Sequence, residues 1–126
     1  MARRVLIAAC IAAAASLAAG CGSSAVKLAK DDPDHAGAVV FAEHCGACHT
    51  MDAAGTQGSA TDVSDRENVD GPSFDDRKEN VEDVLFAIEN GGFSGAIMPE
   101  NIVTGEEARQ IANFLAKYAG PGAPKP

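Results

Sequence analysis

The feature that most constrains this chain is the pentapeptide Cys45-Gly46-Ala47-Cys48-His49. Two thiols three residues apart, followed directly by a histidine, form the pattern at which a c-type haem is attached. The spacing suits the chemistry, because each thiol can bond one vinyl group and the adjacent imidazole can then reach the iron. The segment therefore predicts one covalent haem c, bound by Cys45 and Cys48, with His49 as an iron ligand.

Two other kinds of site use the same residue types. A thioredoxin-like dithiol would need a strand before the motif and a helix after it, whereas a helical pattern precedes this motif and a glycine-rich loop follows it. A zinc site would need four ligands, and the chain offers only His35, His44 and His49 besides the two cysteines, without a second ligand pair. Haem attachment explains the motif better than either.

The N-terminus predicts export. Arg3 and Arg4 precede an apolar run from Val5 to Ala19, which is shorter than the roughly 20 residues of a membrane-spanning helix and is typical of a secretory signal peptide, here residues 1–20. The run ends in small residues before Cys21, which resembles a bacterial lipoprotein cleavage site. We expect Cys21 to be lipidated and to hold the protein on the outer face of the bacterial cytoplasmic membrane. The alternative is an ordinary signal peptide with Cys21 unmodified.

The charge of the chain is strongly acidic. Its formal net charge is −8, and loss of Arg3 and Arg4 with the signal peptide would take it to −10. So acidic a protein is a poor binder of nucleic acid and favours partners with basic docking surfaces.

The remaining chain divides into a tether, a domain and a tail. Residues 21–33 are rich in Ser, Ala, Lys and Asp and predict a tether, and the Gly/Pro-rich residues 121–126 predict a disordered tail. Residues 34–120 predict one domain. No segment in it alternates convincingly as a strand, so the predicted class is all-α.

Three helices are expected within this domain. The first covers residues 34–45, with Asp34 as its N-cap. The second covers residues 81–89, with Asn80 as the N-cap and Gly91 as the stop. The third starts with a capping box of Thr104 and Glu107 and ends near Gly120.

Between the first two helices lies a long polar loop, residues 50–76. A loop of this length needs something to hold it, and a chain without tryptophan has a thin core. A large apolar cofactor would meet both needs. The loop also contains Asp62, Asp65, Glu67 and Asp70, whose spacing is not that of a calcium loop, so we interpret them as a solvated acidic loop.

The folded part resembles the class I, single-haem cytochrome c family. Its matching residues are Gly37, Phe41 and Cys45 in the first helix, Gly71-Pro72, Met98-Pro99, and Leu115 and Tyr118 in the last helix. The resemblance implies a small fold of three to four helices around the haem, with the two terminal helices crossing at Gly37. It also implies that the Pro72 carbonyl binds the far nitrogen of His49 and that Met98 is the sixth iron ligand.

The residues themselves favour Met98 as well. Met51 follows His49 too closely to reach the opposite face of a haem, and His35 and His44 are expected to point to solvent. Met98 follows a glycine-rich approach and precedes a proline that stiffens the loop. The competing interpretation is an open iron.

These features predict a non-enzymatic one-electron carrier in a membrane-associated respiratory chain. The alternatives are a haem-bearing subunit of an oxidase or dehydrogenase and, less favoured, an open-iron haem sensor or peroxidase.

Overall fold

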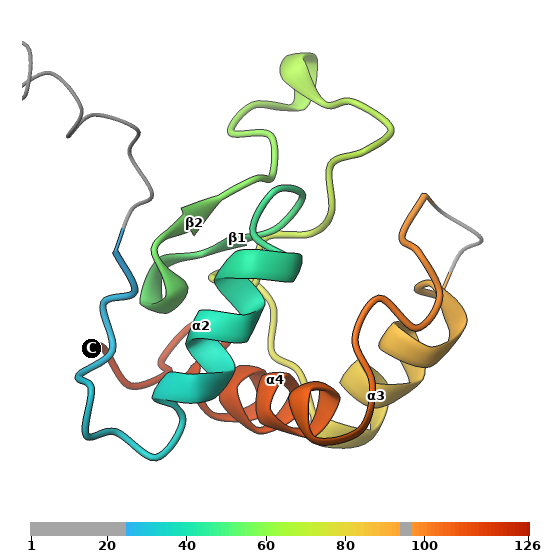
Figure 1. Cartoon of the computed structure of the whole chain (residues 1–126). Helices are drawn as coiled ribbons and strands as arrows, with labels where there is room; N and C mark the ends of the chain where they lie inside the picture. Colours follow the sequence, from blue (N-terminus) through green and yellow to red (C-terminus); the bar gives the residue numbers. More distant parts are fainter. Residues whose placement is uncertain (1–24, 94–96) are drawn as a thin grey trace, which may run out of the picture.

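Three helices form the framework of the computed structural model, which describes residues 25–93 and 97–126. They are α2 (His35–His44), α3 (Val81–Asn90) and α4 (Gly105–Tyr118), and Figure 1 shows α2 and α3 each packed against α4. The predicted all-α class is confirmed.

The predicted signal peptide and Cys21 lie outside the described residues. Within the described ranges, no helix has both the length and the apolar character needed to cross a membrane.

The crossing of α2 and α4 depends on Gly37. A Cβ atom built on Gly37 would lie 2.2 Å from the backbone oxygen of Gln110 and 2.9 Å from Cβ of Phe114. Only a residue without a side chain allows this approach. The expected role of Gly37 is confirmed, but Phe114, which is fully buried there, was not singled out from the sequence.

The α3 helix begins and ends as its sequence predicts. The Asn80 side chain accepts a hydrogen bond from the backbone N–H of Asp83, which satisfies a free donor of the first turn. At the other end Gly91 has a φ of 68°, a left-handed conformation that ends helices at little cost for glycine. Val84 and Ile88 form the buried face of the helix.

Two predicted caps are wrong in detail. Thr104 stands at the N-cap of α4 but its side chain makes no capping hydrogen bond, because Gly105 enters the helix with a φ of 60° and the usual cap geometry is lost. Asp34 stands at the N-cap of α2, again without a side-chain cap. Its carboxylate instead accepts a hydrogen bond of 2.8 Å from Nζ of Lys117 on α4, so it joins the two helices.

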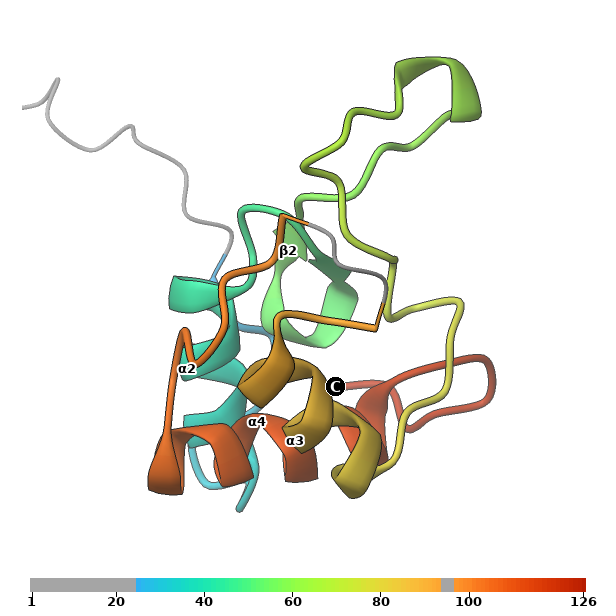
Figure 2. The ribbon, with the colours of Figure 1, turned by 90° about the vertical axis from the view of Figure 1, so that its right-hand side faces the viewer.

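The loop after the attachment motif contains a small hairpin that the sequence did not predict. Strands β1 (Thr50–Met51) and β2 (Thr56–Gln57) pair antiparallel, with the 3₁₀ turn η2 (Asp52–Ala54) between them; a second 3₁₀ turn, η3 (Val63–Asp65), follows. Two residues per strand are too few to give an alternating pattern. Figure 2 shows that the loop of about residues 60–70, which includes η3, projects away from the helices.

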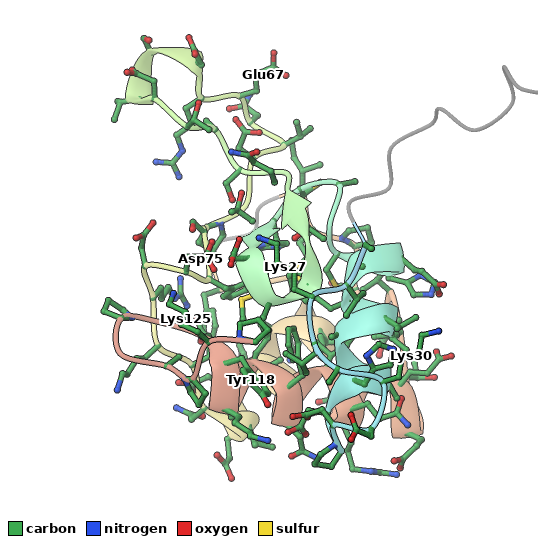
Figure 3. The ribbon with its side chains drawn as sticks, turned by 90° about the vertical axis from the view of Figure 1, so that its left-hand side faces the viewer. Lys27, Lys30, Glu67, Asp75, Tyr118 and Lys125 are labelled. Carbon is green, nitrogen blue, oxygen red and sulfur yellow. The ribbon has the colours of Figure 1, made fainter. Side chains whose placement is uncertain are left out.

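The predicted tether is partly packed onto the domain. Leu28 is only 4% exposed and belongs to the core, and the backbone N–H of Lys27 donates to the carbonyl of Ala53. His35, expected to point to solvent, is half-buried, and its Nδ1 lies 3.0 Å from the carbonyl oxygen of Leu28. Figure 3 shows Lys27 close to the hairpin. Leu28, with Val26 packed beside the core and Asp32 accepting a hydrogen bond from the hydroxyl of Tyr118, therefore docks residues 25–33 onto the domain. Residues 21–24 lie outside the described ranges.

Candidate haem site

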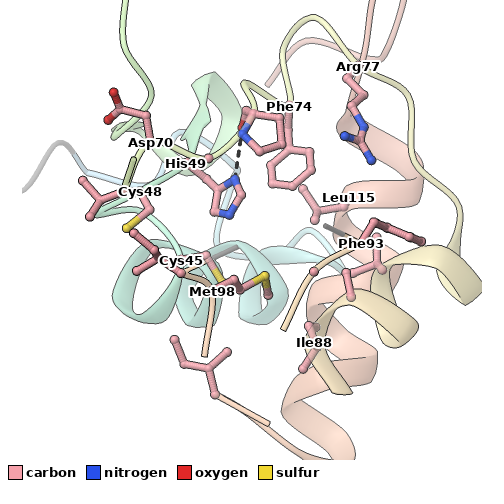
Figure 4. A pocket seen from close by; sticks show the side chains of 18 of the residues that line it. Cys45, Cys48, His49, Asp70, Phe74, Arg77, Ile88, Phe93, Met98 and Leu115 are labelled. Atoms are coloured by element: carbon pink, nitrogen blue, oxygen red, sulfur yellow. Dashed lines mark hydrogen bonds between the residues drawn. The ribbon is translucent and has the colours of Figure 1, made fainter. Parts of the chain in front are cut away.

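A cavity of about 700 Å³ lies between the helices and the loops that follow α2 and α3. Its volume is within the usual range of pockets that bind cofactors or drug-sized ligands. Phe41 of α2, Ile88 of α3 and Leu115 of α4 contribute apolar side chains to its wall. The five residues predicted to bind the cofactor come from three separate segments of the chain, and all of them line it: Cys45, Cys48, His49, Pro72 and Met98. Figure 4 shows Cys45, Cys48, His49 and Met98 around the same space.

The attachment segment forms a tight turn directly after α2. The backbone N–H groups of Cys48 and His49 both donate to the carbonyl of Cys45, at 3.1 and 3.0 Å. Both cysteines are free thiols, Cys48 being exposed and Cys45 half-buried. Burial, with a smaller contribution from the neighbouring Cys48, raises the pKa of the Cys45 thiol to about 12. Both cysteines line the cavity, and Cys45 does so as an uncharged thiol.

The His49 ring is oriented by the proline loop. Its Nδ1 lies 3.0 Å from the carbonyl oxygen of Pro72; a carbonyl can only accept, so Nδ1 carries the proton and Nε2 keeps its lone pair for a metal. Burial, opposed by the Pro72 bond and aided by the charge of Arg77, lowers the pKa of His49. The ring also stacks on Phe74 with centroids 4.9 Å apart. His49 is thus a neutral imidazole in a defined orientation.

Gly71 allows the proline loop to reach His49. A Cβ atom at Gly71 would lie 2.3 to 2.7 Å from three atoms of the imidazole ring. The backbone N–H of Gly71 also donates to the carbonyl of Cys48 at 2.7 Å. The Gly-Pro pair therefore serves two purposes, since the glycine permits the approach and the proline supplies the acceptor.

The two methionines of the domain occupy different places. Met51 is 1% exposed and its side chain lies in the core behind the motif, outside the cavity. Met98 is half-buried and lines the cavity. His44 is exposed, as expected, but it also lines the cavity mouth beside Cys45. The flexible approach to Met98 was predicted from a segment whose residues 94–96 lie outside the described ranges.

The acidic loop forms part of the rim. Glu67 and Asp70 line the cavity, as does Val63, which is 90% exposed. Among the described residues no group of three or more His, Cys, Asp or Glu side chains is placed to hold a metal ion.

Two charged residues of the cavity wall are not indicated by any pattern in the sequence. Arg77 and Glu79 follow the proline loop and line the cavity as an ion pair. They lie in an irregular segment between Phe74 and α3, where no periodicity indicates which side chains point inward. Their place in the cavity wall is visible only once the fold is known.

The chain's residues fit a haem. The cavity is mainly apolar, two thiols stand at its edge, and an oriented neutral imidazole faces it. A family model described as Cytochrome c matches residues 35–119, well over half of the chain. Searches among curated proteins and among solved structures return no match. Since the family match spans all three helices and the whole cavity, the chain belongs to the cytochrome c family, binds one haem c covalently and is an electron carrier.

Proposed function

We propose that this protein carries single electrons in a membrane-associated respiratory chain, with His49 and Met98 as the two axial ligands of its iron. The observation that supports this ligand pair best is that both side chains line one cavity, whereas Met51 lies in the core. When bound, the haem supplies a metal that takes up or releases one electron. A thioether ligand favours ferrous iron, so His/Met ligation raises the reduction potential.

The residues of the chain have distinct tasks in this proposal. Cys45 and Cys48 hold the haem covalently. His49 offers Nε2 to the iron, while the carbonyl oxygen of Pro72 accepts a hydrogen bond from Nδ1–H of the same ring. Phe74 stacks on the imidazole and limits its rotation. Such fixed ligands need little rearrangement when the charge of the iron changes, which suits electron transfer without a bound substrate.

A matched pair of substitutions tests the sixth ligand. Met98→Leu removes the sulfur at nearly constant volume, so the weak sulfur-to-iron charge-transfer band of the ferric protein should vanish, the reduction potential should fall and carbon monoxide should bind the ferrous form. Met51→Leu should change none of these. A wild-type protein that lacks the band and binds carbon monoxide without denaturation would favour the open-iron sensor or peroxidase.

For the location, we propose export and a lipid on Cys21, which would place the protein on the outer face of the bacterial cytoplasmic membrane. Acyl chains contribute about 0.8 kcal/mol per buried CH₂, and two or more chains anchor a protein stably. Cys21→Ser should therefore move the protein from the membrane to the released fraction. Finding the wild type released, with a mature N-terminus other than Cys21, would contradict the lipid anchor.

The proposed partners are redox proteins with basic docking surfaces. The chain has 18 acidic and 10 basic residues, and charges are screened over a Debye length of about 10 Å at 0.1 M salt. Stopped-flow electron exchange with a basic redox protein should therefore slow as salt is added. Exchange with an acidic redox protein is the control and should accelerate. A rate with the basic partner that rises with salt would rule out an acidic docking surface.

A further inference from the structure

The wall of the haem cavity contains a buried carboxylate that the proposed ligands do not explain. The side chain of Glu79 is only 5% exposed, and it lines the cavity. Its Oε1 lies against Nε of Arg77, but that contact lacks hydrogen-bond geometry, and Oε1 finds no donor among the described residues. Buried carboxylates without hydrogen bonds are rare because removing their charge from water is costly.

Arg77 connects this carboxylate with the iron-binding side of the cavity. Its guanidinium lines the same wall and is half-exposed, and Figure 4 shows it on the side of Phe74 and Leu115. The Glu79 carboxylate therefore acts mainly on the interior of the cavity, whereas the Arg77 guanidinium lies between the cavity and solvent.

We propose that Glu79 and Arg77 form an internal charge pair that sets the reduction potential of the haem. Ferric iron carries one positive charge more than ferrous iron, and the single electron that separates the two comes from a redox partner. A carboxylate in a poorly solvated wall stabilises the ferric form and lowers the potential, while the guanidinium beside it opposes that effect. The inference rests on the haem occupying the cavity and is independent of the identity of the sixth ligand.

Redox titration of the holoprotein tests the pair. Glu79→Gln removes the buried charge and keeps the shape, so the midpoint potential should rise. Glu82→Gln is the matched control, because it makes the same change three residues away at an exposed position outside the cavity. We expect the shift of Glu79→Gln to be several times that of Glu82→Gln and to persist at high salt, which screens exposed charges far more than buried ones.

Substitutions of Arg77 should shift the midpoint potential in the opposite direction. Arg77→Gln should lower the midpoint potential, and Arg77→Lys, which keeps the charge, should stay closer to the wild type. If Glu79→Gln does not retain haem, the two Arg77 variants still decide the question. Equal shifts in Glu79→Gln and Glu82→Gln, or an Arg77→Gln protein with the wild-type potential, would overturn the proposal. The visible spectrum reports iron ligation separately, so an error in the sixth ligand would not be mistaken for an error here.

Discussion

Replacing Gly37 with alanine should reduce the free energy of unfolding by about 3 kcal/mol or more, the upper end of the usual range for overpacking a core. The added methyl group would lie 2.2 Å from the Gln110 oxygen and 2.8 Å from its carbonyl carbon. These are backbone atoms of α4, which cannot move aside as the end of a side chain can. The helices would have to separate, and the packing of Phe41 against Phe114, whose ring centroids are 5.9 Å apart, would loosen.

Urea denaturation of the holoprotein measures this effect. Alanine favours helix formation over glycine by about 1 kcal/mol, so helix propensity alone would make Gly37→Ala more stable than the wild type. Ala36→Gly, at an exposed position next to it, isolates the propensity and should cost about 1 kcal/mol. If Gly37→Ala unfolds at the same urea concentration as the wild type or a higher one, the close crossing of the two helices is wrong.

The double substitution Cys45→Ser and Cys48→Ser should abolish covalent haem and leave a chain that does not fold stably. The cavity of about 700 Å³ reaches the core residues Phe41, Ile111 and Leu115, and without haem their cavity-facing sides lose their packing partner. A domain of this size has a total stability of about 5–15 kcal/mol. Losing the contact between the haem and so small a core should remove a major part of that stability.

Haem staining after denaturing electrophoresis, with circular dichroism of the same samples, measures both effects. Each single variant should keep some haem through its remaining thioether. Cys45→Ser should be the less stable of the two, since Cys45 is half-buried and Cys48 is exposed, and a buried hydroxyl without a partner is unfavourable. A double variant that still stains for haem would refute attachment at these cysteines.

Features that depend on local chemistry were predictable from the sequence. The attachment motif identifies its cofactor because bonding two vinyl groups and an iron requires a fixed spacing of donors within five residues. The α3 helix was predicted with both ends, since Asn80 and Gly91 act on backbone groups within a turn of their own positions. The proline-loop bond from His49 to Pro72 was expected from family resemblance and is present at 3.0 Å.

Features that depend on residues meeting across the fold could only come from the tertiary structure. Asp34 lost its predicted capping role because Lys117 of α4 lies within hydrogen-bonding distance. Leu28, in a segment that reads as a tether, is buried because the domain offers an apolar site for it. The ion pair of Arg77 and Glu79 faces the cavity because its irregular segment is held between Phe74 and α3. The sequence by itself therefore determined the cofactor and the helical class, and it predicted His49 as the proximal ligand, because the spacing along the chain is sufficient for these features. The tertiary structure decided which charges surround the cofactor, because burial and distance arise only when distant segments pack together.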